Sequence, residues 1–150
     1  MRRRKLILLF FFVPLVWLAQ DEARGGTLFS KTYQFKPTTA LTIGADIEPG
    51  IRLDTVKFSL PTSEDGKISR ASDSATAEVA ISNTGTESRK MGVALALFDD
   101  AGRLLGVATG GDKLMALKPG RQATYVLTFS MVNAETPSAT RFQISVETKP

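Results

Sequence analysis

The chain contains no cysteine and no histidine among its 150 residues. Without cysteine it can form no disulfide, thiolate metal site, thiol nucleophile or acylated lipoprotein terminus. Without histidine, the Ser-His and Cys-His catalytic arrangements are impossible. The serine-nucleophile motifs G-x-S-x-G and S-x-x-K are absent as well. These absences remove the commonest hydrolase and redox chemistries.

The chain also lacks an apolar run long enough to cross a bilayer as a helix, which takes about 20 residues. Its longest run, Leu6 to Ala19, has 14 residues and follows the basic stretch Arg2–Lys5. A basic segment before a short apolar run is the form of a secretory signal helix. Small residues at Ala23 and Gly25 favour cleavage near Gly25. We expect residues 1–25 to be a signal peptide or, if uncleaved, a short membrane anchor.

The basic character of the chain belongs to this first segment. The whole sequence has 19 Lys and Arg against 15 Asp and Glu. Residues 1–26 contain five of the cations and two of the anions, which leaves 14 against 13 and a net charge of +1. A domain with this balance has no electrostatic basis for nucleic-acid binding.

From Gly26 onward, apolar residues recur with a period of two, which indicates β-strands. In the first half, Ile51 and Leu53 are out of phase with Val56, Phe58 and Leu60, so we expect a bulge near Asp54–Thr55. The polar stretch from Pro61 to Asp73 predicts a long loop. The other alternating sets of this half are Phe29, Tyr33 and Phe35, then Leu41, Ile43, Ala45 and Ile47.

The second half alternates more regularly. The series from Met91 to Leu97 has apolar residues on both faces and predicts a central strand. We predict that Tyr125 also points inward from a central strand and that its hydroxyl reaches a backbone partner. Turns are predicted at Glu48–Gly50, Asn83–Gly85, Asp99–Gly102 and, as type II, Lys118–Arg121. The remaining inward sets are Ala77, Val79 and Ile81; Ala123, Leu127 and Phe129; and Phe142, Ile144 and Val146, with Leu105 and Val107 on a return strand.

About eight short strands with regular turns and no amphipathic helix predict an all-β fold. The expected architecture is an immunoglobulin-like antiparallel β-sandwich over residues 26–150, preceded by an N-terminal signal or anchor helix. An antibody-type domain with a disulfide against a tryptophan is excluded, because there is no cysteine pair and Trp17 lies in the signal segment.

Three segments between Ala75 and Phe129 are typical of bacterial extracytoplasmic modules. Leu95-Ala96-Leu97-Phe98-Asp99 resembles the F-x-L-Y-D signature, with leucine where that signature begins with phenylalanine. Leu117-Lys118-Pro119-Gly120, followed by Ala123-Thr124-Tyr125, resembles the turn before the penultimate strand of such modules, and Asn83-Thr84-Gly85 matches a further turn. The chain thus resembles FxLYD-type immunoglobulin-like domains. This resemblance implies a sandwich fold but no catalytic or binding residue.

Carboxylates are the remaining candidates for chemistry. Asp99, Asp100 and Asp112 fall in predicted loops that a meander could bring to one end, and Asp46 and Glu48 flank a turn. Oxygen ligands of this kind suit calcium, although aspartate is also an ordinary turn residue.

Other candidate features have simpler structural interpretations. Gly106 to Lys113 resembles a phosphate-binding loop imperfectly, with Asp112 in place of the lysine, and predicts a flexible hairpin. For Met91, Met115 and Met131 we predict core packing rather than soft-metal binding. We likewise expect the aromatic residues to pack in the core and not to form a sugar-binding platform.

The sequence therefore predicts no catalytic, cofactor-binding or metal-ligating residue and no cofactor. We expect a non-catalytic, exported module that binds an unknown protein or surface polymer in the cell envelope. It would lie in the periplasm, be secreted, or face outward from the membrane, touching the membrane only through residues 1–25. The alternative is a carboxylate-based enzyme or a calcium-dependent ligand-binding domain.

Overall fold

A computed structural model describes residues 26–37, 39–60, 75–112, 115–131 and 138–150. The expected signal segment, residues 1–25, and the expected loop from Pro61 to Asp73 lie outside the described residues. Within those ranges no helix is long and apolar enough to cross a membrane.

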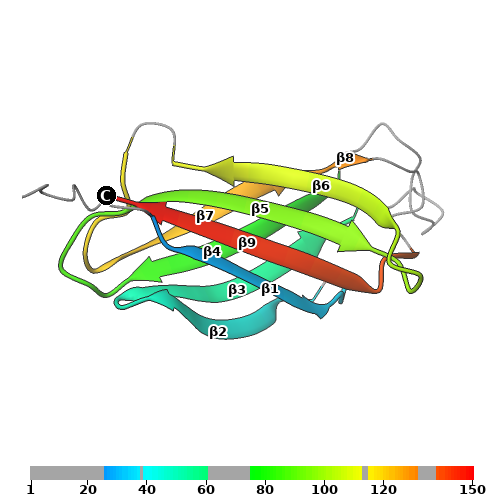
Figure 1. Ribbon diagram of the computed structural model, residues 1–150, viewed down its shortest axis with the longest axis horizontal. Helices are drawn as coiled ribbons and strands as arrows, with labels where there is room; N and C mark the ends of the chain where they lie inside the picture. Colours follow the sequence, from blue (N-terminus) through cyan, green and yellow to red (C-terminus); the bar gives the residue numbers. More distant parts are fainter. Residues whose placement is uncertain (1–25, 38, 61–74, 113–114, 132–137) are drawn as a thin grey trace, which may run out of the picture.

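The described residues form two antiparallel sheets that lie face to face as two layers (Figure 1). The five-stranded sheet has the order β1-β9-β5-β6-β8 and the four-stranded sheet the order β2-β3-β4-β7. The strands are β1 Leu28–Gln34, β2 Leu41–Glu48, β3 Ile51–Ser59, β4 Thr76–Asn83, β5 Lys90–Phe98, β6 Leu104–Gly111, β7 Arg121–Thr128, β8 Ser130–Met131 and β9 Arg141–Lys149. The all-β prediction is thus confirmed.

Alternating side chains from both sheets fill the space between the layers. In β5, Met91, Val93, Leu95 and Leu97 are each at most 3% exposed, and β4 and β9 show the same alternation. β5 lies between β9 and β6, which confirms its predicted central position. The pairing of β3 with β4 shifts between Leu53 and Thr55, so the predicted bulge is also confirmed. The bulge brings Leu53 and Val56 onto the same buried face.

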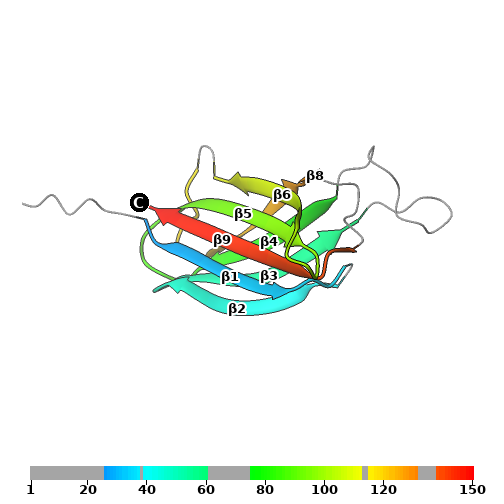
Figure 2. The ribbon, with the colours of Figure 1, turned by 45° about the vertical axis from the view of Figure 1, so that its right-hand side comes forward.

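The strands of both sheets run between two ends of the layered structure (Figure 2), and these ends differ in composition. At one end β1 begins, β9 finishes and the β2–β3 turn lies, with Glu48, Asn83 and Arg89; we call it the polar end. At the other, the aromatic end, the Phe58 ring centroid lies 4.7 Å from that of Phe35 and 5.0 Å from that of Phe142. Phe129 lies 6.2 Å from Phe58 at the same end.

Several local predictions are wrong. Tyr125 points inward, but β4 is the one described strand with which β7 pairs, so β7 is an edge strand and not a central one. Gly106 to Gly111 is not a hairpin, because it pairs with β5 along most of its length as β6. Met91 is buried as expected, whereas Met115 follows β6 outside any strand and is 77% exposed. The side chain of Met131 is not described.

Candidate functional site

The structure separates the carboxylates that the sequence suggested could converge. β5 and β6 run antiparallel along the sheet, so Asp99 and Asp100 lie at the aromatic end while Asp112 lies beside Met91 at the polar end. At about 3.3 Å per strand residue, roughly 25 Å separates Asp99 from Asp112. Asp46 is exposed on β2, and Glu48 ends β2 at the polar end, where Asp112 also lies.

Asp99 is committed to its own hairpin. Its Oδ1 accepts a hydrogen bond from the Arg103 backbone N–H at 2.8 Å, and its Oδ2 pairs with the Arg103 Nε at 2.6 Å. The backbone hydrogen bond from Arg103 holds the pKa of Asp99 below its usual value, ahead of the opposing effect of burial. With both oxygens bonded to Arg103 in the same hairpin, Asp99 acts as a turn residue.

Asp112 bridges the two sheets at one edge. Its Oδ2 accepts hydrogen bonds from the Tyr125 hydroxyl at 3.0 Å and from the Met91 backbone N–H at 3.1 Å. The partner of the Tyr125 hydroxyl is therefore a carboxylate, not the predicted backbone group. Burial, with the neighbouring Asp112, raises the pKa of the Tyr125 hydroxyl.

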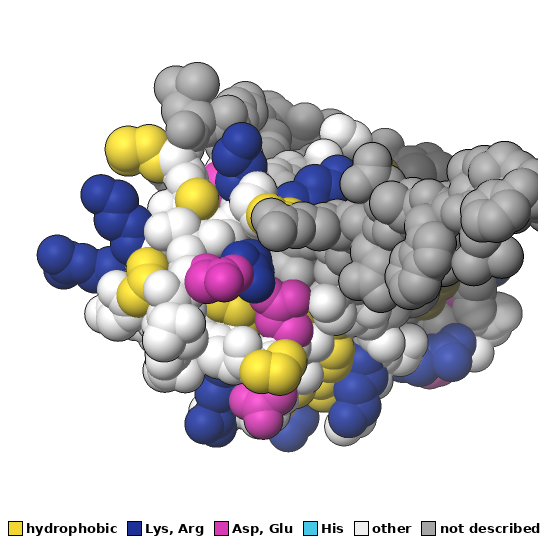
Figure 3. Space-filling model, turned by 60° about the vertical axis from the view of Figure 1, so that its left-hand side comes forward, with side chains coloured by type: hydrophobic (Ala, Val, Ile, Leu, Met, Phe, Trp, Pro, Cys, Tyr) yellow, Lys and Arg dark blue, Asp and Glu magenta, His cyan; other side chains and the backbone are white. Residues whose placement is uncertain are grey.

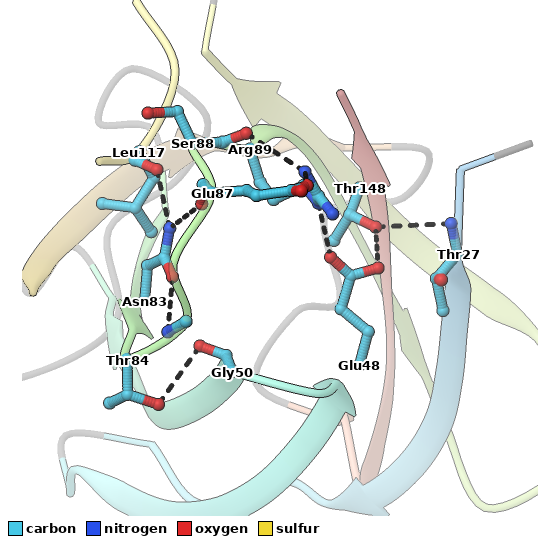
Figure 4. A network of polar contacts seen from close by, with 11 residues as sticks. Thr27, Glu48, Gly50, Asn83, Thr84, Glu87, Ser88, Arg89, Leu117 and Thr148 are labelled. Carbon is cyan, nitrogen blue, oxygen red and sulfur yellow. Dashed lines mark hydrogen bonds and ion pairs between the residues drawn. The ribbon is translucent and has the colours of Figure 1, made fainter. Parts of the chain in front are cut away.

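The densest group of polar contacts surrounds Glu48 (Figure 4). Its Oε1 pairs with the Arg89 Nε at 2.9 Å, and its Oε2 accepts a hydrogen bond from the Thr148 hydroxyl at 2.8 Å. The Thr148 hydroxyl in turn accepts from the Thr27 backbone N–H, and Arg89 also pairs with Glu87. One cluster thus joins the end of β2 in one sheet to the ends of β1, β5 and β9 in the other.

The ionised form of Glu48 is stabilised despite its partial burial. Burial raises the pKa of this carboxyl, but hydrogen bonds from Thr148, Thr27 and Arg89 and the charge of Arg89 outweigh it, so the pKa is lowered. A general acid or base works best with a pKa near the operating pH. Glu48 is shifted the opposite way, which favours a structural carboxylate over a catalytic one.

Asn83 organises the loops beside this cluster. It is 1% exposed, and its Nδ2 donates to the backbone oxygens of Glu87 and Leu117 at 2.8 and 2.9 Å. Its Oδ1 accepts from the Gly85 backbone N–H at 2.9 Å. The predicted turn at Asn83–Gly85 is confirmed, and the buried amide links it to the segment before β7.

Two hollows flank the Glu48–Arg89 pair. One, of about 390 Å³, is lined by Gly26, Thr27, Glu48, Glu87, Arg89, Thr148, Lys149 and Pro150. The other, of about 160 Å³, lies over the β2–β3 turn and the Asn83 loop. Acidic and basic side chains lie close together on this end of the molecule (Figure 3). The exposed Glu87 could accept hydrogen bonds from a polar partner, and the exposed Lys149 could donate them.

Sequence reasoning missed Arg89 and Thr148, which lie 41 and 100 residues from Glu48 along the chain. No local pattern marks such pairs. In the part of the chain that the structure describes, no group of three or more acidic side chains could hold a metal ion. No aromatic residue is among its exposed large hydrophobic side chains.

Comparison with known proteins adds no family: no protein-family model matches the chain, and no curated protein matches it either.

Proposed function

We propose that this protein is a non-catalytic, exported module of the cell envelope that binds another protein or a surface polymer. The observation that carries the proposal is that the ordered carboxylates of the candidate site are already engaged by the protein itself. Both oxygens of Glu48 and both of Asp99 have partners within the chain. Side chains held in this way stabilise a scaffold for recognition better than they serve a reaction.

The connectivity of the strands supports an immunoglobulin-like classification within this proposal. The chain passes from one sheet to the other between β1 and β2, β4 and β5, β6 and β7, and β7 and β8. Repeated crossing of this kind is typical of Greek-key sandwiches. The FxLYD-type resemblance of Leu95 to Asp99 fits here, since this segment is the end of β5 and the start of its hairpin.

Export is tested on the full chain in a bacterial host. We expect the protein in the exported fraction, either shortened near Gly25 by intact mass or held at the membrane by residues 1–25. The control replaces the four basic residues Arg2, Arg3, Arg4 and Lys5 by glutamate, which removes the charge pattern of a signal. Equal cytoplasmic retention of both proteins would contradict the proposal.

The calcium alternative is tested by thermal melts with calcium chloride and with chelator. We expect the two melting temperatures to coincide, because Asp99 and Asp112 lie at opposite ends of β5 and β6. Binding to the native state must raise its stability. A clear upward shift with calcium would restore the alternative.

A further inference from the structure

One loop at the polar end combines an exposed apolar side chain with basic ones. Met115 is 77% exposed, and Lys118 and Arg121 follow it on the turn into β7. The antiparallel bridge between Arg89 and Leu117 holds this loop beside the start of β5, where Lys90 is exposed. We call Lys90, Met115, Lys118 and Arg121 the basic tip; Figure 3 shows Lys and Arg side chains projecting from this end.

The charge of the basic tip is not cancelled by its described neighbours. Lys90, Lys118 and Arg121 form no ion pair with another described residue. The acidic side chains of the same end have other partners: Glu48 and Glu87 pair with Arg89, Glu147 with Lys149, and Asp112 accepts from Tyr125 and Met91. An approaching anion therefore meets three cations on one end of the fold.

The chain enters the fold at this same end. Thr27 is hydrogen-bonded to Thr148, next to Lys149. Residues 20–26 connect the apolar run Leu6–Ala19 to this point, and seven residues span at most about 25 Å. This step rests on the membrane-anchored form of the proposed function. In that form the polar end is tethered within about 25 Å of the bilayer.

We propose that the basic tip contacts an anionic phospholipid surface, so that the membrane holds the domain through residues beyond the anchor. Lys and Arg near an anionic leaflet are attracted to its surface potential. An exposed apolar side chain among them can enter the boundary between headgroups and acyl chains. Met115 and its basic neighbours present this combination.

The cysteine-free sequence allows a direct test on the full chain. Met115→Cys, labelled with a fluorophore, is reconstituted in phosphatidylcholine vesicles with or without phosphatidylglycerol, each containing a lipid-attached quencher. Leu104→Cys is the matched control, since Leu104 is 40% exposed at the aromatic end. We expect strong quenching at residue 115 only with phosphatidylglycerol and little quenching at residue 104.

A charge series completes the test. Each Lys or Arg near an anionic surface contributes a factor of about five, so Lys118→Gln with Arg121→Gln should weaken the tip contact about 25-fold. The matched pair Lys36→Gln with Lys57→Gln, which removes two exposed cations elsewhere, should leave it unchanged.

Equal quenching at residues 115 and 104, or quenching at residue 115 that ignores phosphatidylglycerol, would overturn the inference and leave the anchor intact. A full chain that does not associate with either vesicle would overturn the inference and the membrane-anchored form together.

Discussion

The polar and aromatic ends of this protein join the same two sheets by different physical means. At the polar end, the ion pair of Glu48 with Arg89 and the buried amide of Asn83 link strands and loops through directed contacts. At the aromatic end, Phe58 contacts the rings of Phe35, Phe129 and Phe142.

The two kinds of contact respond differently to change. Ring packing depends on buried apolar area and filled volume, whereas the polar contacts depend on geometry and on the charge state of Glu48. The comparison predicts that the contribution of Glu48 at the polar end varies with pH, whereas the contribution of ring packing at the aromatic end does not.

The largest effect is expected at the aromatic end. Phe58→Ala removes the ring at the centre of the cluster, where Phe58 is 1% exposed, and should lower the free energy of unfolding by about 3–5 kcal/mol. Urea melts at pH 7 measure it. The milder Phe58→Leu keeps the protein folded if the first variant does not fold. A decrease in the free energy of unfolding below about 1 kcal/mol for Phe58→Ala would show that ring packing does not stabilise this end.

At the polar end, Asn83→Ala should cost roughly 2–3 kcal/mol, because it removes the three hydrogen bonds of a buried amide, two to backbone carbonyls and one from a backbone N–H. Gln122→Ala is the control, since it removes one exposed hydrogen bond to Asp54 and should change stability by no more than about 0.5 kcal/mol. Equal midpoints for the two variants in urea would contradict the role given to Asn83.

Glu48→Gln keeps the size of the side chain and removes its charge, and should cost about 1–2 kcal/mol at pH 7. Because the folded pKa of Glu48 is lowered from its ordinary value of 4.5, its contribution is present above that value. It is lost as pH falls through the folded pKa. The stability difference between wild type and Glu48→Gln should therefore shrink as pH is lowered below about 4.5.

Denaturant melts across the acid range check this prediction, with the stability difference between wild type and Phe58→Leu as the reference that should not change with pH. Parallel curves for wild type and Glu48→Gln would show that Glu48 adds no pH dependence to the stability of the polar end.

The smallest effect concerns the edge where Tyr125 meets Asp112. Tyr125→Phe removes one hydrogen bond and should lower the free energy of unfolding by about 0.5–1.5 kcal/mol. Tyr125→Ala also leaves a cavity where the buried ring was, and should lower it further. Urea melts of both variants decide the point. An unchanged midpoint for Tyr125→Ala would place this side chain outside the stabilising core.

Much of the fold follows from local pattern. The series from Met91 to Leu97, with apolar residues on both faces, predicts the central strand that β5 is, and the phase change after Leu53 predicts the observed bulge. Pro119 and Gly120 predict the turn before β7, where Gly120 has a φ of 68°.

What the sequence did not predict is non-local. The sequence around Tyr125 would look the same in an edge strand and in a central one. Which of the two it is depends on whether a second strand pairs beside β7, and the local pattern does not contain that information. Gly106 to Gly111 looks flexible alone but pairs with β5, which carries Asp112 to the polar end. The Glu48–Arg89 pair exists only once β2 and β5 lie in facing sheets.

The pairing of β1 with β9 sets an order of events in time. Of the described strands, β1 is the first to leave a ribosome and β9 the last, yet β9 is the one described strand with which β1 pairs. No earlier strand offers β1 its native neighbour, so the five-stranded sheet cannot close until residues 141–149 have emerged. Contacts between such distant segments form slowly. The five-stranded sheet therefore stays incomplete for most of the chain's synthesis.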